Sequence, residues 1–545
     1  MSSQFERLRS KAERLKKLNQ FAESAALFRR FIRVYPEDTE ALMSLADLEM
    51  RLENFTEASK IYAALVEKFP KKSIHYANLG AALLRLGRVS DARAILDYAL
   101  EIDDKNLFAR INLGGVLQAQ EDFQEALRNA LEAVSIAPTH PLAFNNLGSA
   151  FSDLDMMEEA QHAYETSIML DNGQVDALIN LGVVESRRGR HQRAIEHFER
   201  ALEILPPEQQ GRAEAIKFFA CFSYFYTNQW EKAWDYYELG FSPLVPVGGA
   251  RSPRRVFPVP KWDGFAAPGK SLLIWREQGV GDEILFASIF KDLLSSGMRI
   301  VVECDPRLVS LWKRSFPDFV VRPSAFYSDS MEPMIVDYDF HLPICSLGAL
   351  FRRNKISFSN FQPYLRPDPD LVLEFAARVE KLAQGRPKVG VLWRSIKLIP
   401  TRNRGYTLPA SWEGVLDRKD LCFFSLQYNV TKGEILEAET KFRTQIHVFD
   451  DVDYKDDFDR VAALISQMDM VISPDTTMFE IAGALDIPTI CMTVYPDGHY
   501  GCGDHFPYYP SVRILRTDDS KQDATDLLKK LPAMVDEFLV KYVRT

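Results

Sequence analysis

The chain has 545 residues, and because single cores rarely grow past about 250 residues we expect two or three domains. With 46% of its residues hydrophobic, the chain can bury a core in each. It carries 66 basic and 76 acidic side chains, and this net charge of -10 argues against a general binder of nucleic acid or of anionic membranes. No apolar run reaches the roughly 18 residues of a membrane span and the N-terminus lacks a signal-peptide core, so we expect a cytoplasmic protein without membrane insertion.

The cysteines and histidines are too widely spaced to form a recognisable metal site. No Cys-x-x-Cys pair occurs among the six cysteines, and the nine histidines show no ligand spacing. We therefore expect neither a disulfide framework nor a bound metal.

The N-terminal part of the chain repeats with a period of 34 residues. The triplet Asn-Leu-Gly recurs at this interval, and an alanine follows each of its glycines by twelve residues. A helix-breaking or polar residue closes each unit, as at Pro70, Asp104 and Pro138. This pattern resembles the tetratricopeptide repeat, a pair of antiparallel helices that stacks into a superhelix. The match covers about residues 5 to 206, a further repeat-like stretch begins at Trp230, and we expect the superhelix to occupy residues 5–240.

The asparagines of the triplets are candidate ligands for a polypeptide. They are Asn78, Asn112, Asn146 and Asn180. Equivalent positions in stacked repeats form a ladder, and a carboxamide can both donate to and accept from an extended backbone. A similar ladder holds acceptor polypeptides in the nucleocytoplasmic O-linked N-acetylglucosamine transferase, and that resemblance favours a peptide-binding role. The alternative is that these side chains bridge neighbouring repeats or bind water.

A segment rich in proline and glycine, residues 241–264, predicts a linker, and short apolar runs separated by helical segments follow it. The expected strands are Leu272 to Trp275, Ile300 to Cys304, Phe319 to Val321, Lys388 to Trp393, Cys422 to Leu426, Ile446 to Phe449, Met470 to Ser473 and Thr489 to Thr493. This alternation predicts parallel sheets with crossover helices in two Rossmann-like halves, residues 265–384 and 385–545. Ligands of such sheets bind beyond the carboxyl ends of the strands.

Five segments of this part carry a family resemblance: "LLIWREQGVGDEILFA", "KVGVLWRS", "FFSLQ", "DMVISPDTTMFEIAGALDIPTI" and "PYYPSVRILR". Together they resemble the GT-B glycosyltransferase module that follows tetratricopeptide repeats in bacterial proteins and is similar to heptosyltransferases. The tandem also resembles flagellin-modifying glycosyltransferases, whose repeats bind flagellin. The predicted fold is thus an α-solenoid followed by an α/β GT-B module.

The segment "SPDTTMFEIAGALDIPT" predicts a phosphate site. Asp475, Thr476 and Thr477 follow a strand and begin a helix, where unpaired backbone amides and the helix dipole favour an anion. In the family that the segment resembles, this helix binds the donor phosphates. Plain capping of the helix by Asp475 or a threonine is the alternative. Relatives commonly carry His where this chain has Glu480.

The segment "WREQGVGDEILFA" joins a strand to a helix through Gly279 and Gly281, which we expect to line the donor cleft. It lacks the third glycine of a dinucleotide fingerprint and the Lys-Ser/Thr of a P-loop. In heptosyltransferase-like enzymes the matching Gly-Asp supplies the catalytic base, which implies that Asp282 deprotonates the acceptor hydroxyl. Glu277 and Glu283 are alternative bases, and Asp282 could instead only favour the helix N-terminus.

Positive charge near the leaving nucleoside phosphate is expected from Arg394 and Arg404, although a solvated surface role is the alternative for each. Gln427 follows another predicted strand and is expected to line the same cleft. The aromatic stretch Tyr495 to Pro510 could stack on a sugar or base, or could be an ordinary loop. The two Asp-x-Asp stretches, residues 451–453 and 457–459, are interpreted as solvated acids, so amides and arginines take the place of a metal.

The sequence thus predicts a metal-independent protein O-glycosyltransferase. The repeats hold a polypeptide, with flagellin the leading acceptor, and the α/β module transfers sugar from a nucleotide-activated donor to Ser or Thr. No cofactor beyond this donor substrate is expected. Two alternatives stay open: a noncatalytic scaffold whose GT-B domain senses a nucleotide or is inactive, and a glycan-elongating transferase.

Overall fold

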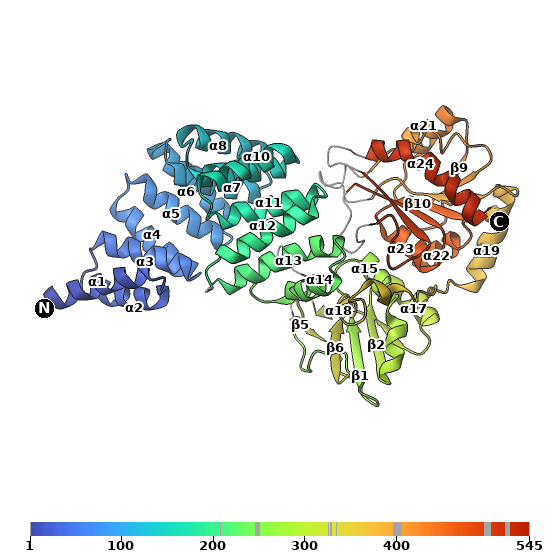
Figure 1. Ribbon diagram of the computed structural model, residues 1–545, viewed down its shortest axis with the longest axis horizontal. Helices are drawn as coiled ribbons and strands as arrows, with labels where there is room; N and C mark the ends of the chain where they lie inside the picture. Colours follow the sequence, from blue (N-terminus) through green and yellow to red (C-terminus); the bar gives the residue numbers. More distant parts are fainter. Residues whose placement is uncertain are drawn as a thin grey trace. The chain divides into compact units, whose positions relative to one another are not determined.

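The computed structural model describes residues 2–207, 209–245, 251–324, 326–327, 330–333, 335–395, 406–494, 503–517 and 524–543. The chain forms two compact units, Met1–Val184 and Glu185–Thr545, and the division falls inside helix α11. Figure 1 shows the order of the elements along the chain.

The first unit is a run of antiparallel helical hairpins (Figure 1). Its helices are α1 (Ser2–Lys17), α2 (Phe21–Ile32), α3 (Thr39–Arg51), α4 (Phe55–Lys68), α5 (Ser73–Arg85), α6 (Val89–Ile102), α7 (Leu107–Ala119), α8 (Phe123–Ile136), α9 (Pro141–Asp153), α10 (Met157–Leu170) and α11 (Val175–Arg187). From α4 onward, equivalent helices begin 34 residues apart. The predicted helical repeat is confirmed.

The small residues of the repeat let the paired helices approach closely. A Cβ built on Gly80 would lie 2.5 Å from Cγ of Leu96, and one on Gly148 would lie 2.6 Å from Cε1 of Tyr164. Ala92 and Ala160 are wholly buried on the opposing helices. A larger side chain at these glycines would therefore push the helices of a hairpin apart.

The second unit begins with helices and continues with a first sheet. Its first part contains α12 (His191–Ile204), α13 (Gln210–Tyr226), α14 (Trp230–Tyr237), η1 (Glu238–Phe241), β1 (Ser271–Trp275), α15 (Val280–Ala287), α16 (Phe290–Leu293), η3 (Leu294–Ser296), β2 (Arg299–Cys304), η4 (Pro306–Leu308), α17 (Val309–Ser315), β3 (Val320–Pro323), β4 (Phe326–Tyr327), β5 (Ser330–Pro333), β6 (Phe340–Pro343), α18 (Ser346–Phe351), η5 (Lys355–Phe358) and α19 (Pro369–Ala383).

Its second part contains β7 (Lys388–Val391), η6 (Pro409–Ser411), β8 (Cys422–Ser425), α21 (Lys432–Phe442), β9 (Ile446–His447), α22 (Phe458–Ile465), β10 (Met470–Pro474), α23 (Thr477–Ala484), β11 (Thr489–Thr493), β12 (Val512–Arg516), α24 (Ala524–Phe538) and the π-helical turn η8 (Leu539–Val543).

Both larger sheets are parallel and doubly wound. The first has the order β3-β2-β1-β6, and the second has the order β12-β11-β10-β7-β8-β9. In chain order the second sheet reads 6-5-4-1-2-3, so its strand order reverses between β7 and β10. In the first sheet the reversal lies between β1 and β6. Ligand sites of such sheets form outside the carboxyl ends of the strands at these reversals. The predicted α/β module of two parallel sheets is confirmed.

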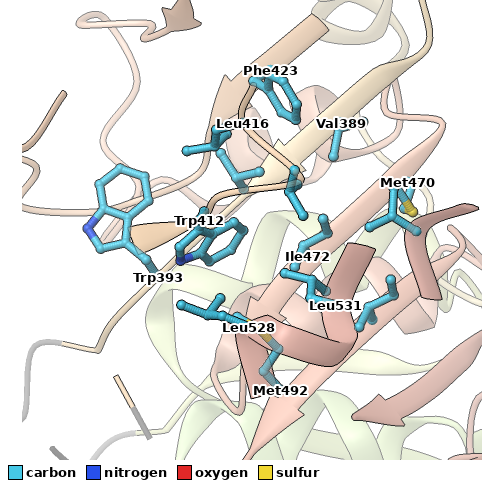
Figure 2. Close-up of a cluster of buried hydrophobic side chains, with 14 of the residues drawn as sticks. Val389, Trp393, Trp412, Leu416, Phe423, Met470, Ile472, Met492, Leu528 and Leu531 are labelled. Atoms are coloured by element: carbon cyan, nitrogen blue, oxygen red, sulfur yellow. The ribbon is translucent and has the colours of Figure 1, made fainter. Parts of the chain in front are cut away.

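One large apolar core lies on the second sheet. Figure 2 shows Val389, Phe423, Met470 and Met492 of the strands turned toward Trp412 and toward the helix that carries Leu528 and Leu531. The strands bury both faces and read as continuous apolar runs, which is typical of parallel sheets covered by helices.

The expected linker is partly integrated into the first sheet. Within it, Lys261 forms an isolated parallel bridge to His341 of β6, and the Trp262 amide donates to the His341 carbonyl at 2.9 Å. Helices α12, α13 and α14 belong to the same compact unit as the sheets. The boundaries at residues 240, 264 and 384 remain a prediction. Among the described residues, no helix combines the length and the apolar character that crossing a bilayer requires.

A buried histidine predicts acid sensitivity of the second unit. His191 is 5% exposed and stacks on Tyr226 with ring centroids 3.7 Å apart. Burial, together with Arg516, lowers the pKa of His191 from 6.5 to about 4. The unfolded chain therefore binds more protons between these values, so the free energy of unfolding is highest above the unfolded pKa and falls as the pH drops.

Between about pH 7.5 and about pH 5, we expect the free energy of unfolding of His191→Gln to fall by about 2 kcal/mol less than that of the wild type. Urea unfolding followed by tryptophan fluorescence measures this, because all seven tryptophans lie between Trp230 and Trp412 and so report the second unit. His341→Gln is the parallel variant, since burial beside Lys261 and Arg255 also lowers the pKa of His341 to about 4. Equal pH dependence of the variant and the wild type would contradict the assignment.

Candidate functional site

The two candidate segments of the α/β module lie against each other. Helix α15 contacts helix α23, and the two are drawn side by side in Figure 1. A Cβ built on Gly281 would lie 3.7 Å from Cγ of Glu480 and 3.8 Å from Oγ1 of Thr477. The turn after β1 and the turn after β10 each follow a strand at a point where a sheet reverses its order. Segments about 200 residues apart in the chain thus lie against each other, at the kind of position where parallel sheets bind ligands.

Asp282 lies in the first turn of α15 and is half-buried. Its Oδ2 accepts a hydrogen bond from the Gly279 amide at 2.9 Å. This is the contact expected of an acid that favours a helix N-terminus, and it also fixes the carboxylate beside Gly281. A carboxylate can accept more than one proton donor, so the geometry permits the capping role and the predicted base role together.

The N-terminus of α23 has no side-chain cap from its N-cap residue. Thr476 is the N-cap residue but makes no side-chain capping bond, and its Oγ1 lies 3.2 Å from Oγ of Ser473. Thr476 and Thr477 are half-buried and Asp475 is exposed. Capping by Thr476 is therefore not seen, and the other predicted alternative, capping by Asp475, stays open. Donor binding by these three residues stays a prediction.

The two alternative bases are fully buried in ion pairs. Glu277 is 0% exposed and accepts from Arg251 Nε at 2.8 Å. Glu283 is also 0% exposed, lies 3.0 Å from Arg276 Nε, and accepts the Asp305 amide at 2.8 Å. Burial raises the pKa of Glu283 to about 8, against the opposing effect of Arg276. Neither carboxylate is placed to meet a substrate, and Asp282 is the most exposed of the three acids.

The carboxamide of Gln427 makes all of its hydrogen bonds to the loops that follow β7 and β8. Its Oε1 accepts the amides of Trp393 at 3.2 Å and Arg394 at 3.1 Å, and its Nε2 donates to the carbonyls of Arg394 at 3.0 Å and Tyr428 at 2.9 Å. A carboxamide makes four such bonds at most, and Gln427 is 0% exposed. Its position therefore supports shaping of the loops rather than direct donor contact.

Arg394 is paired within the protein, while Arg404 lies outside the described residues. The Arg394 guanidinium donates to Glu434 through Nε at 2.8 Å and Nη2 at 3.0 Å, and Nη2 also reaches the Asn429 carbonyl at 3.0 Å. Phosphate would have to compete with Glu434 for this group. Contact of either arginine with the donor remains a prediction.

The asparagine ladder of the first unit bridges adjacent repeats. Nδ2 of Asn112 donates to the Ala77 carbonyl at 3.0 Å, and Nδ2 of Asn146 donates to the Ile111 carbonyl at 2.9 Å. Asn180 donates to Oδ1 of Asn145 at 3.2 Å. Each bond spans 35 residues, so the amide donors serve the alternative role of holding neighbouring repeats together. The side chains stay half-buried, and peptide capture would fall to their carbonyl oxygens.

The acidic stretches are largely occupied by ion pairs and helix caps. Asp451 receives two hydrogen bonds from Arg378, and Asp457 caps α22 by accepting the Arg460 amide at 3.1 Å. In the aromatic stretch, residues 495–502 lie outside the described part. Phe506, Tyr508 and Tyr509 are 3% exposed or less, so these three rings serve packing.

A tyrosine pair beside α15 was not predicted from the sequence. The Tyr364 hydroxyl donates to the Ile284 carbonyl at 2.5 Å and lies 2.9 Å from the Tyr509 hydroxyl. Tyr364 belongs to the segment between the sheets and Tyr509 to the segment before β12. Tyr509 lies in one of the segments that carry the family resemblance, but no pattern pairs it with Tyr364, and only the folded chain brings the two to the Asp282 helix.

Comparison with known proteins decides the nature of the helical array. Tetratricopeptide-repeat family models match residues 10–71, 44–106, 142–174 and 175–207. The array is built of tetratricopeptide repeats. This agrees with the 34-residue spacing of its helices.

Curated relatives extend the comparison. The chain is 32% identical over 298 residues to Protein FlbA of Caulobacter vibrioides, which covers 53% of this chain and 49% of FlbA. It is 24% identical over 95 residues to human Protein O-mannosyl-transferase TMTC1, which covers 17% of this chain and 11% of that protein. The chain therefore spans about half or less of the length of these relatives.

One similar solved structure has a lower sequence identity to this chain than these curated relatives have. A thermophilic tetratricopeptide-repeat protein of Thermus thermophilus, TTC0263, is 18% identical with a TM-score of 0.31, covering 33% of this chain and 98% of that chain. At this TM-score the likeness carries no statement about function.

Proposed function

We propose that this repeat protein is a glycosyltransferase that moves a sugar from a nucleotide-activated donor to Ser or Thr of a polypeptide. The donor phosphates bind at the N-terminus of α23, and Asp282 accepts the proton of the attacking hydroxyl. The observation that carries the proposal is the proximity of Gly281 to Thr477, which brings the acid-bearing turn to the N-terminus of α23.

The chemistry of this arrangement fits sugar transfer without a metal in the reaction. A hydroxyl is a weak nucleophile until a base takes its proton, and Asp282 supplies a fixed carboxylate. The leaving nucleoside diphosphate gains negative charge, and unpaired amides with the positive dipole end of α23 stabilise it. Such groups act without reorganising, because the strands and helices hold them in place.

The resemblance to flagellin-modifying enzymes and the repeats support a polypeptide acceptor, with flagellin the leading one. TMTC1 is named as a protein O-mannosyl-transferase, and the similarity to it is consistent with this class. We name the α/β module as GT-B type on the resemblance of its five segments, and we place the reaction in the cytoplasm.

One observation favours a second candidate, a noncatalytic scaffold that senses a nucleotide. Gln427 and Arg394, both expected at the donor, are engaged with the protein's own loops and Glu434. A glycan-elongating transferase is the remaining alternative, and it does not require the repeats to hold a polypeptide.

Sugar transfer tests the proposal. The full chain is incubated with unglycosylated flagellin and each of a set of nucleotide sugars, and peptide mass spectrometry locates any hexose-sized or larger addition. We expect modified Ser or Thr with one donor class. Nucleotide binding without modification of any protein acceptor would favour the scaffold, and growth of free saccharides would favour the glycan-elongating enzyme.

The ladder gives a prediction for acceptor binding. In Asn112→Ala with Asn146→Ala, two carboxamides of the half-buried ladder are lost, and we expect the KM for the polypeptide to rise about tenfold or more. Nucleotide affinity should stay unchanged, because the donor is bound in the other unit. Because the same side chains bridge repeats, the melting temperature of each variant is measured alongside. Unchanged polypeptide KM in folded variants would remove the ladder from acceptor binding.

A further inference from the structure

A wholly buried arginine joins the end of the helical segment to the turn that carries Asp282. Arg251 is 0% exposed. Its guanidinium donates to both oxygens of Glu277, through Nε at 2.8 Å and through Nη2, and to Glu238 through Nη1 at 2.7 Å. Nη2 also reaches Oγ of Ser346 at 3.1 Å. One side chain therefore contacts η1, the turn after β1 and the start of α18.

The surroundings hold this arginine in one position. Its guanidinium carbon lies 4.4 Å from the ring centre of Tyr237 and 4.3 Å from that of Phe241. Gly240 leaves the space for it, since a Cβ there would lie 2.7 Å from Cγ of Arg251. Ser346 Oγ donates to Glu238 at 2.7 Å, which closes the network. Removing one partner of a buried charge that is so fully paired would leave the other groups without a counter-ion, so the network resists rearrangement.

The network ends at the proposed catalytic turn. Glu277 also accepts the Cys345 amide at 3.0 Å, and the next residue, Gln278, donates its amide to the Ser252 carbonyl at 2.8 Å. Gln278 has φ +57°, a left-handed conformation that a non-glycine residue keeps only where its surroundings impose it. Directly after it, the Gly279 amide binds Asp282. The segment 251–252 thus fixes the turn immediately before the acid.

We propose that Arg251 is a positioning residue: it fastens the turn of residues 277–282 to the last helical hairpin before the first sheet and so sets the orientation of the Asp282 carboxylate. This rests on the proposed function for the role of Asp282 in transfer. The clamp itself stands on the contacts alone. Glu277, an alternative base by sequence, is in this account the anchor of the clamp.

Arg251→Lys keeps the charge but loses the planar fork that reaches Glu277, Glu238 and Ser346 together. The matched control is Arg255→Lys. Arg255 lies four residues further along, is 0% exposed at its side chain, and pairs with Glu303 of β2 at 3.0 Å, while its guanidinium carbon lies 5.3 Å from the ring centre of Trp275 at the end of β1. Ser346→Ala removes one partner without changing charge and gives a milder variant that should fold in any case.

Hydrogen–deuterium exchange of the full-length protein measures how firmly Arg251 holds the turn, and it needs no assay of activity. We expect backbone amides of residues 276–287 to exchange at least about tenfold faster in Arg251→Lys, less so in Ser346→Ala, and as in the wild type in Arg255→Lys. Wild-type exchange of this segment in Arg251→Lys, or equal acceleration in Arg255→Lys, overturns the proposal.

Kinetics separate this inference from the proposed function. If the wild type transfers sugar, Arg251→Lys should lower kcat about tenfold and leave the KM for the nucleotide sugar unchanged, because the donor lies on α23. A higher donor KM with unchanged kcat overturns the positioning role. If the wild type transfers no sugar while the exchange pattern is as expected, the proposed function fails and the clamp stands.

Discussion

Asp282→Asn should lower the rate of sugar transfer by about 10²- to 10⁴-fold, the usual contribution of a positioned general base. The asparagine carbonyl can still accept the Gly279 amide, so the turn and the start of α15 should keep their structure. It cannot take a proton from the acceptor hydroxyl. Steady-state transfer to a saturating polypeptide acceptor measures the loss as a change in kcat.

The control is Asp370→Asn, which alters an exposed acid in the first turn of another helix, α19. We expect it to transfer sugar at the wild-type rate. Nucleotide affinity should be the same in wild type and Asp282→Asn, because the proposed site of the donor phosphates is the N-terminus of α23. An Asp282→Asn protein that turns over within about twofold of the wild type would remove the base assignment.

Trp234→Ala should cost roughly 3–5 kcal/mol of unfolding free energy in the second unit. Trp234 is 0% exposed, and its ring packs edge-on against Phe225 with centroids 4.6 Å apart. Its Nε1 donates to the Arg352 carbonyl at 2.8 Å, and a Cβ on Gly348 would overlap its ring. Loss of the indole leaves a cavity between α14 and α18 and an unpaired carbonyl.

Urea unfolding followed by the fluorescence of the remaining tryptophans measures this loss. Phe265→Ala is the control, since Phe265 is 76% exposed and should change stability by less than about 0.5 kcal/mol. A Trp234→Ala protein as stable as this control would show that α14 does not depend on its packing against α18.

The parts of the fold predicted best are those set by local periodicity. The 34-residue spacing placed every helix from α5 to α12, because each repeat buries the same face. The predicted strand Thr489 to Thr493 coincides with β11, a continuous apolar run. Strands β6 and β12 were not predicted, since His341 in one and the arginines Arg513 and Arg516 in the other interrupt the apolar pattern. Their place in a sheet depends on neighbours that are distant in sequence.

In the candidate site too, only the residues with a local sequence signal could be predicted. The turns at Gly281 and Thr477 could be located, because a glycine-rich or capping segment after a buried strand is a local signal. The partners of Gln427, Arg394 and Glu277 could not, because a side chain that saturates its bonds inside the protein has the same sequence signature as one that awaits a ligand. The clamp of Arg251 depends on contacts across as many as 95 residues and appears only in the fold.

The central claim is that an activated sugar nucleotide binds at the N-terminus of α23, next to the facing turn of α15, and nucleotide binding tests it most directly. Melting of the full chain is followed with UDP, GDP, dTDP, ADP and CMP, for the wild type and for Thr476→Ala and Gly281→Leu. One nucleotide at about one hundred times its Kd should add about 2.7 kcal/mol to the wild type, and much less to either variant. Stabilisation by none of the five, or equal stabilisation of wild type and both variants, would contradict the site.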